Sequence, residues 1–220
     1  MVDLETWDQR GLFSRRPADL SGAAHFYHTM DVPGRGLVTG LWDLRAGLEA
    51  YLGHVDYAGC TVLEIGPSSG FITFTLERRG ATMVAVDLPV EGDRDLFPVS
   101  AKAVADHRRS EAPHRRAARN AFWIAHQAFD SRARLVEASV DDLDPGLTGF
   151  DVAIVCNVMQ HRSDPVGMLL NLADRATTIV VTEADWLGGT NDAKPVMQLV
   201  TPSIRAGGLY SWFVVSPQLV

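Results

Sequence analysis

A turn rich in glycine and serine carries the first residues whose types and spacing suit ligand binding. The apolar residues 61–65 lead into a turn with Gly66 and Gly70, and a helical pattern follows. Because Gly66 has no Cβ, the backbone can turn sharply there and approach a ligand closely. We expect Ser68 or Ser69 to cap the helix, whose first N–H groups then face the end of the strand.

A carboxylate follows the next apolar run. Asp87 comes directly after residues 82–86, at the tip of the expected neighbouring strand. A carboxylate there accepts hydrogen bonds from both hydroxyls of a ribose. With the turn, Asp87 and the adjacent Leu88 predict a site for an adenosine ligand.

The acidic residue before the turn separates two kinds of adenosine ligand. A dinucleotide turn reads G-x-G-x-x-G, so that the backbone lies against a pyrophosphate, whereas this chain reads Glu64-x-Gly66-x-x-x-Gly70. Glu64 would repel a diphosphate and suits a cationic amino acid. The turn resembles the E/D-x-G-x-G-x-G motif of class I S-adenosylmethionine-dependent methyltransferases. Ser68 stands where the motif has its middle glycine. The resemblance implies that five residues of the motif bind this cofactor: Glu64, Gly66, Pro67, Ser68 and Gly70.

The segment after the third expected strand carries the next site implied by the resemblance. Residues 134–137 run into Ala138-Ser-Val-Asp-Asp142. The family places here an acidic residue that accepts a hydrogen bond from the adenine amino group. Asp141 or Asp142 fits, and we prefer Asp141, with Val140 stacking on the ring. The alternative is that residues 142–145 form only a turn.

The segment after the fourth strand holds the candidate catalytic residues. Residues 156–165 are similar to the N-V-L-x-H-x-x-D-P pattern of many small-molecule methyltransferases. Ligands of an open parallel sheet bind beyond the carboxyl ends of its strands, so Asn157 and His161 would lie near the methyl sulfonium. Neutral His161 could take a proton from an attacking hydroxyl or amine. Alternatively, His161 orders the loop by bonding to Asp164 or to backbone.

The end of the fifth strand and one helix supply candidate substrate contacts. Glu183 and Trp186 come at the fifth strand end, and Trp186 is expected to form a substrate wall. Trp123 is a second aromatic candidate, although such a residue is more often packed. A metal on Glu183 and Asp185 would lack a third ligand, so we expect none.

The N-terminal segment carries a second resemblance. Residues 26–45 look like the Y-H-T-I-x-L-P-G…T-P-G-x-x-D-x-R opening of a methyltransferase subgroup related to enzymes that modify the wobble uridine of tRNA. Such an opening lies over the cofactor as a lid. The resemblance implies that Tyr27 and Arg45 face the cofactor and that His28 faces the substrate. We expect Asp43 to order the lid by pairing with Arg45.

Alternating strand and helix signals predict an α/β fold, a Rossmann-like doubly wound, mostly parallel sheet with helices on both faces. We expect a lid and first helix at 1–55 and a cofactor-binding domain at 56–220, with a helical insertion at about 88–133. The expected strands are 61–65, 82–86, 134–137, 151–156 and 178–183, and the expected helices are 41–52, 69–79 and 166–175.

The insertion contains two basic groups. His107-Arg-Arg109 and His114-Arg-Arg116 precede a helical face of alanines from Ala117 to Ala128. These cations could hold an acidic substrate or RNA phosphates. The alternative is a solvated helix surface interrupted by Pro113.

The C-terminal region is less informative. Residues 207–215 suggest another strand, and Ser216-Pro217 suits a helix start. The family resemblance fades after Trp186. The family's closing antiparallel strands should follow such a helix. We therefore expect either a chain truncated at its C-terminus, which we favour, or closing strands that are missing or replaced.

Composition limits the remaining choices. The 220 residues, 46% hydrophobic and 21% charged, suit one sizeable α/β domain. Neither a membrane span nor a secretion signal is evident in the sequence, so we expect a cytoplasmic protein. The net charge of −7 argues against a general nucleic-acid binder. A homodimer is compatible with the sequence.

These patterns lead to one main functional hypothesis. The chain is expected to transfer a methyl group from S-adenosylmethionine to a small molecule, leaving S-adenosylhomocysteine, with O-methylation in secondary metabolism preferred. One alternative is a tRNA-modifying methyltransferase. Another is a noncatalytic S-adenosylmethionine-binding partner subunit.

Overall fold

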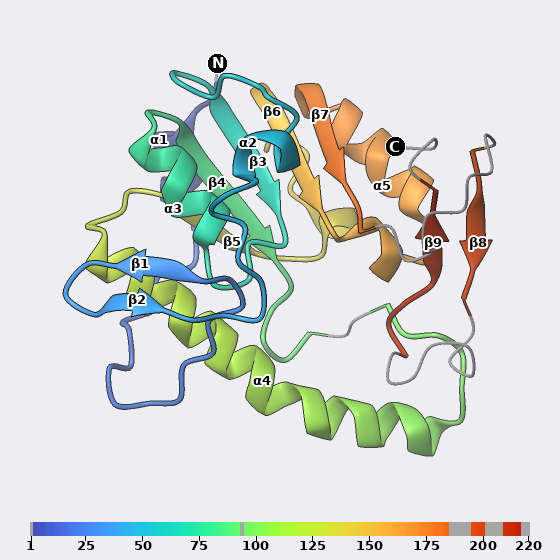
Figure 1. The fold of residues 1–220 in the computed structure, drawn as a ribbon. Coiled ribbons are helices and arrows are strands. Elements are labelled where there is room, and N and C mark those ends of the chain that lie inside the picture. Colours follow the sequence, from blue (N-terminus) through green and yellow to red (C-terminus); the bar gives the residue numbers. More distant parts are fainter. Residues whose placement is uncertain (1, 93–94, 185–194, 201–208, 217–220) are drawn as a thin grey trace.

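A five-stranded parallel sheet forms the centre of the molecule (Figure 1). The computed structural model describes residues 2–92, 95–184, 195–200 and 209–216. The strands lie in the order β5-β4-β3-β6-β7. Along the chain, β4 and β5 are added on one side of β3, and β6 and β7 are then added on its other side. Their bounds are β3 Thr61–Ile65, β4 Thr82–Asp87, β5 Arg134–Glu137, β6 Phe150–Cys156 and β7 Ala176–Thr182. The predicted doubly wound, Rossmann-like sheet is confirmed.

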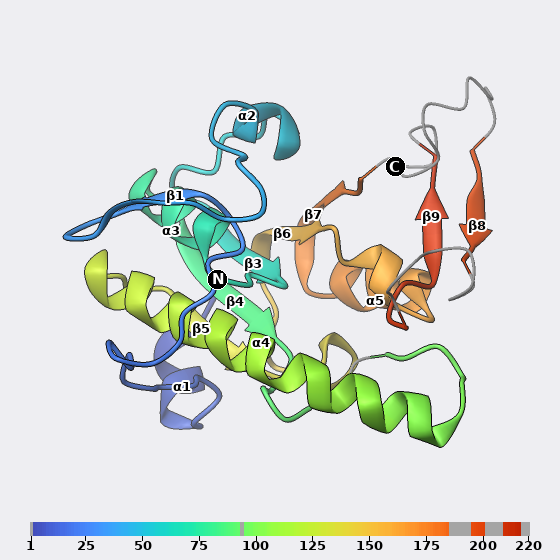
Figure 2. The ribbon, with the colours of Figure 1, turned by 60° about the horizontal axis from the view of Figure 1, so that its bottom comes forward.

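Both faces of the sheet carry a hydrophobic core because side chains alternate along each strand. From β3, Val62 packs with α3 (Phe71–Arg78) and the second half of α4 (Ala101–Ala128). Leu63 packs on the opposite face with α1 (Leu4–Gln9) and α5 (Pro165–Ala173). Figure 2 shows α3 and α1 on opposite sides of the sheet.

The N-terminal region differs most from expectation. It contains α1, the antiparallel strands β1 (Met30–Val32) and β2 (Gly36–Val38), and the short helix α2 (Leu48–Tyr51). The predicted helix over 41–52 is wrong except for its last turn. Trp42 instead pairs with an earlier segment, since its N–H donates to the Tyr27 carbonyl at 3.2 Å and its carbonyl accepts from Thr29 at 2.8 Å.

Helix α4 is longer than expected. It runs through Pro113 without a break, so the predicted interruption is wrong. All of its buried residues lie in the second half, while the first half extends toward the C-terminal strands (Figure 1). In the part of the chain that the structure describes, no helix is long and apolar enough to cross a membrane.

The C-terminal region contains an antiparallel pair, which corrects the expectation that the closing strands are missing or replaced. Strands β8 (Met197–Leu199) and β9 (Phe213–Val215) pair with each other apart from the central sheet. The Trp212 N–H joins this region to the body by donating to the Gln160 carbonyl at 2.7 Å. The expected helix start at Ser216-Pro217 continues outside the described residues.

Candidate functional site

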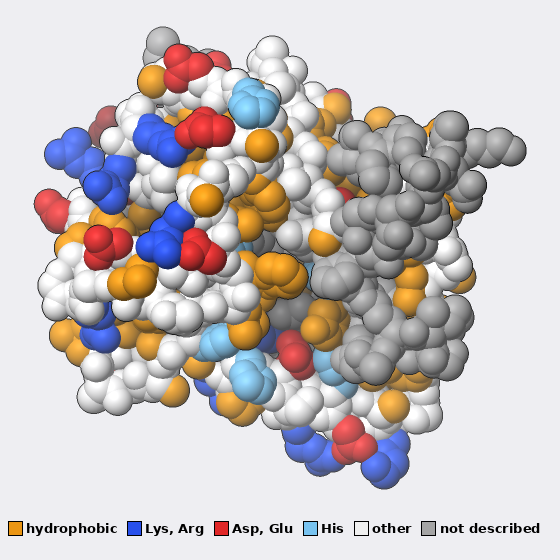
Figure 3. All heavy atoms as spheres, in the orientation of Figure 1, with side chains coloured by type: hydrophobic (Ala, Val, Ile, Leu, Met, Phe, Trp, Pro, Cys, Tyr) orange, Lys and Arg blue, Asp and Glu red, His pale blue; other side chains and the backbone are white. Residues whose placement is uncertain are grey.

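The carboxyl ends of the five parallel strands lie at one edge of the sheet, and the segments that follow them gather most of the predicted site. On the face drawn in Figure 3, the surface is hollowed above α4, with histidine side chains at the rim. The segments at this edge are the 66–70 turn, residues 87–88, 139–142 and 157–161, and Glu183.

The turn after β3 is built around left-handed backbone. Gly70 has φ +87° and is the N-cap of α3, with no side chain bonded to the helix end. A Cβ on Gly70 would lie 2.2 Å from Cε2 of Phe74, so no larger residue fits without displacement. The prediction that Ser68 or Ser69 caps this helix is wrong, because the chain enters α3 through Gly70.

Ser69 has a different role, since it anchors the N-terminal segment. Its buried hydroxyl accepts a hydrogen bond from the Tyr27 N–H at 3.0 Å. The Tyr27 hydroxyl in turn accepts from Trp42 Nε1 at 3.1 Å. The structure therefore brings Tyr27 against the turn.

His28 and Arg45 of the same segment lie in contrasting environments. Burial lowers the pKa of His28 to about 4, and within the described part of the chain its Nδ1 has no hydrogen-bond partner. Arg45 is exposed and pairs with Asp43, with Nη2–Oδ2 at 2.6 Å and Nε–Oδ1 at 2.8 Å. The predicted pairing is confirmed, and it directs the guanidinium of Arg45 to Asp43.

Glu64 is a buried carboxyl group beneath the turn. Its Oε2 accepts from the Thr73 hydroxyl of α3 at 2.5 Å. Burial raises the pKa of Glu64 to about 7, and the Thr73 bond only partly opposes this effect. A cationic group placed beside it would favour the carboxylate form.

Asp87 lies at the end of β4 and is held from two sides. Its Oδ1 accepts from the Leu88 N–H at 2.9 Å, and its Oδ2 lies 3.0 Å from Nη2 of Arg119. Each carboxylate oxygen has two lone pairs, so hydroxyl donors can still bind the side chain. The sequence reasoning missed Arg119, although its helical spacing to Phe122 and Trp123 places it on the core-facing side of α4.

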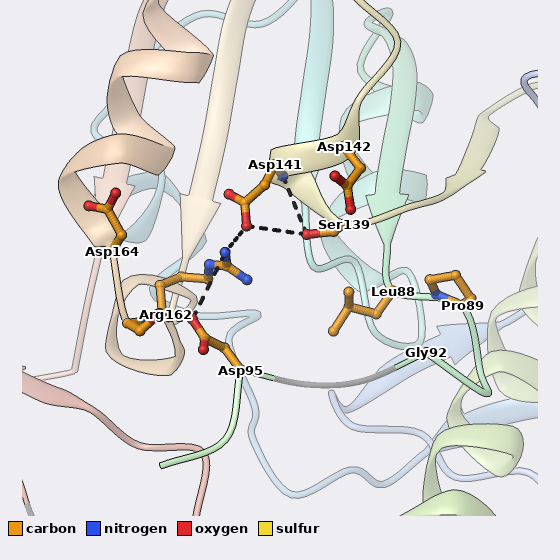
Figure 4. A pocket seen from close by; sticks show the side chains of 10 residues that line it. Leu88, Pro89, Gly92, Asp95, Ser139, Asp141, Asp142, Arg162 and Asp164 are labelled. Atoms are coloured by element: carbon orange, nitrogen blue, oxygen red, sulfur yellow. Dashed lines mark hydrogen bonds and ion pairs between the residues drawn. The ribbon is translucent and has the colours of Figure 1, made fainter. Parts of the chain in front are cut away.

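A cavity of 540 Å³ opens beside Leu88 (Figure 4). Asp141 points into this region, and its carboxylate pairs with Arg162, which lies 4.0 Å from Asp95. Val140 is packed in the core below with 6% of its surface exposed, and its stacking on the adenine stays a prediction. The cavity is lined by Leu88, Pro89, Gly92, Asp95, Ser139, Asp141, Asp142, Arg162, Ser163 and Asp164.

Asn157 follows β6 with φ +54° and joins three parts of the chain. Its Nδ2 donates to the Tyr51 hydroxyl of α2 at 2.9 Å, and its Oδ1 accepts from the Ala184 N–H at 2.8 Å. The side chain thus fixes the residues around the sheet edge relative to one another.

His161 ends the 3-10 turn Met159–His161. Its Nδ1 lies 2.9 Å from the carbonyl oxygen of Tyr210, and the two rings are 5.0 Å apart. A carbonyl accepts only, so Nδ1 carries the hydrogen of the neutral ring and Nε2 keeps its lone pair. Of the two loop-ordering partners considered for His161, the backbone is the one observed, through the Tyr210 carbonyl. Asp164 instead caps α5 by accepting from the Gly167 N–H at 2.8 Å.

The predicted substrate contacts are separated in the structure. Glu183 holds the turn after β6 by accepting from the Met159 N–H at 2.7 Å, and burial raises its pKa to about 7. The prediction that Trp123 contacts the substrate is wrong, because this side chain is packed in the core on α4 with 8% of its surface exposed. Asp185 and Trp186 lie outside the described residues.

Comparisons with known proteins agree with the fold. No family model matches the chain, and no curated protein matches it. The N-terminal domain of EvdMO1, crystallised in the presence of SAH and D-fucose, is 19% identical, with a TM-score of 0.50 over 97% of this chain and 82% of that domain. This likeness shows the fold alone.

Two further solved structures have lower TM-scores. An S-adenosylmethionine-dependent methyltransferase from Mesorhizobium loti is 17% identical, with a TM-score of 0.40 over 71% of this chain and 60% of that one. The O-methyltransferase NcsB1 from neocarzinostatin biosynthesis is 21% identical, with a TM-score of 0.39 over 62% and 35%. The chain therefore spans less than two thirds of either protein.

Proposed function

We propose that the protein transfers a methyl group from S-adenosylmethionine to a small-molecule acceptor. The observation that carries this proposal is the order of ligand-binding groups along the sheet edge. The Glu64 turn, Asp87 and Asp141 follow the adjacent strands β3, β4 and β5. A cofactor lying across these strands meets the three groups with its amino acid, ribose and adenine in that order.

The residues fit this cofactor better than a dinucleotide. Glu64 is a buried carboxyl without a cationic partner among the described residues, and an ammonium group would supply that charge. A pyrophosphate in the same place would be repelled. The cavity beside Leu88 and Asp141 offers room for the adenine. The SAH in the EvdMO1 crystal, whose fold this chain shares, supports the same choice.

We further propose that residues 26–45 act as a lid over this site. The bond from Tyr27 to Ser69 ties the segment to the turn where the amino-acid part of the cofactor would lie. His28 is half-buried beside Phe71 of α3, with ring centroids 5.7 Å apart, and forms part of the same cover. The arrangement supports the lid that the YHT-containing opening implies.

His161 is our candidate for a general base. Bound S-adenosylmethionine would supply a methyl group attached to a positively charged sulfur. The rest of the cofactor, S-adenosylhomocysteine, is a good leaving group. His161 Nε2 would accept the proton of the acceptor's hydroxyl group while that oxygen takes up the methyl group that the cofactor would supply. The Tyr210 carbonyl holds the ring in the required tautomer. Positioning of the two reactants supplies most of the acceleration, and O-methylation in secondary metabolism is our preferred reaction.

Small molecules suit this site better than tRNA. Within the second basic group, Arg115 donates to the carbonyls of Pro89 and Gly92, and Arg116 pairs with Glu91. These cations stabilise the protein's own loop, and the net charge of −7 opposes a polyanion. The presence of D-fucose in the EvdMO1 crystal is compatible with a small acceptor.

Calorimetric titration tests the cofactor first. We expect S-adenosylhomocysteine to bind and NAD to give no heat. Incubation with S-adenosylmethionine and a library of hydroxylated small molecules should then yield a product heavier by one methylene group in mass spectrometry. Binding without any product across the library would favour a noncatalytic partner subunit. If neither S-adenosylhomocysteine nor NAD binds, the proposal is refuted.

A further inference from the structure

Arg119 is a buried arginine that joins the ends of two neighbouring strands. Its side chain is 6% exposed. Nη2 lies 3.0 Å from Oδ2 of Asp87 and donates to the Leu88 carbonyl at 3.1 Å, and Nη1 donates to Oε1 of Glu137 at 2.5 Å. One guanidinium thus contacts β4, β5 and the first residue after β4.

The far side of this bridge is itself anchored. Glu137 accepts from the Ser14 hydroxyl at 2.7 Å and lies 2.9 Å from Nη2 of Arg16. Ser14 and Arg16 therefore fix Glu137, and Glu137 in turn fixes Arg119. A rigid planar fork held in this way leaves the Asp87 carboxylate little freedom to rotate.

The geometry explains why a charge is buried here. An arginine removed from water is costly unless it is paired and fully hydrogen-bonded. Arg119 is paired with two carboxylates and donates to one carbonyl, although replacing buried ion pairs by apolar residues of similar volume is often neutral or stabilising. Two of its three partners, Asp87 and Leu88, belong to the proposed nucleoside site, and Leu88 lines the cavity.

We propose that Arg119 is a positioning residue that fixes Asp87 and Leu88 so that the site selects a ribose with an intact 2′-hydroxyl. This inference rests on the proposed function, because it assigns the ribose of the cofactor to Asp87. Arg119 does not touch the ligand in this scheme. It removes the alternative orientations of the carboxylate that would weaken the hydroxyl contact.

The test compares two ligands rather than one. Calorimetry gives dissociation constants for S-adenosylhomocysteine and its 2′-deoxy analogue. A hydrogen bond to a charged group predicts a wild-type preference of about 10- to 100-fold for the ribonucleoside. In Arg119→Met this ratio should fall toward one, and Arg119→Lys should give an intermediate ratio because lysine cannot bridge both carboxylates in the same geometry.

Arg109→Met is the matched control. Arg109 lies on the same helix and pairs with Asp106, but the two side chains are 77% and 45% exposed. We expect its ligand ratio to equal that of the wild type. Asp87→Asn should reduce the ratio as Arg119→Met does.

Equal weakening of both ligands in Arg119→Met, with the wild-type ratio retained, would mean a purely structural role and overturn the inference. If Arg119→Met does not fold, a wild-type ratio in Arg119→Lys overturns it equally. A wild-type protein that binds both ligands alike refutes this inference but leaves the proposed function standing. A wild-type protein that binds neither ligand refutes the proposed function itself.

Discussion

Asn157 and Tyr51 form a hydrogen bond of 2.9 Å that joins the end of β6 to α2. The other end of the same amide accepts from the Ala184 N–H, after β7. Sequence reasoning placed Asn157 beside the reacting methyl group, and the structure gives this side chain two partners within the protein. These two bonds give Asn157 a structural role beside the proposed site, and its catalytic role stays a prediction.

We predict that Asn157→Ala destabilises the fold by about 2–4 kcal/mol. The variant loses both side-chain bonds, leaves their partners unpaired, and places alanine at φ +54°. Asn157→Gly loses the same bonds without the backbone strain, so it should be about 1 kcal/mol less destabilised. Urea denaturation measures both. Equal stabilities of the two variants would show that the left-handed backbone contributes nothing.

Gly70 gives a second stability prediction. Gly70→Ala combines a positive φ with a Cβ placed against the Phe74 ring, so we expect a loss of about 3 kcal/mol. Gly34→Ala is the matched control, because Gly34 has φ +76° with open space around it. It should lose only about 1 kcal/mol. Thermal unfolding followed by circular dichroism separates the two, and similar losses would mean that Phe74 moves aside freely.

Buried strands were predictable because their sequences are short, apolar and β-branched. The expected strands at 61–65 and 134–137 match β3 and β5 at both ends. The helix expected over 41–52 forms only at Leu48–Tyr51, because Trp42 pairs with residues 27–29. That pairing joins segments more than ten residues apart, so the local sequence pattern of residues 41–52 carries no information about it.

Site positions that depend on where a strand ends were predictable. Contacts between side chains from different elements were less so. The positions of the 66–70 turn and of Asp87 follow from strand ends and were foreseen. The partners of Asp87 and Asp141 were not, since Arg119 and Arg162 come from other elements of the chain. Arg162 resembles an ordinary surface cation in the sequence. For Arg119 the only sequence signal is its helical spacing to Phe122 and Trp123, which indicates the core-facing side of α4 but not the carboxylates it binds.

Glu64 should make the free energy of unfolding depend on pH. Its folded-state pKa of about 7 exceeds its usual value of 4.5, so the folded protein binds more protons between these pH values. The contribution of this group to stability therefore falls as pH rises from about 4.5 to 7 and is constant above. The 2.5-unit difference corresponds to a loss of about 3 kcal/mol at most.

Denaturant titrations from pH 5 to 8 check this prediction. Glu64→Gln should lack the loss, so the stability difference between the variant and the wild type should grow in the variant's favour as pH rises. Glu91→Gln, whose parent side chain is 69% exposed, serves as the control and should parallel the wild type. Parallel curves for Glu64→Gln would contradict the assigned environment of Glu64.

RNA binding should be weak even at low salt. Two arginines of the second basic group are engaged with the 88–92 loop, and phosphate binding would require them to exchange partners. Filter binding with a tRNA pool at low ionic strength is the measurement. Tight association that weakens steeply with added salt would instead support a tRNA substrate.

His161 gives the sharpest test of the chemistry. Once an acceptor is identified, His161→Ala should lower kcat by about 100-fold or more while leaving S-adenosylhomocysteine affinity unchanged. The wild-type rate should fall at acidic pH, where a protonated imidazole cannot accept a proton, and the variant's rate should not follow that fall. His25→Ala is the control, since His25 packs edge-on against His114, with ring centroids 6.3 Å apart. A full rate for His161→Ala at every pH would remove the base from the mechanism, so that positioning alone would account for the rate.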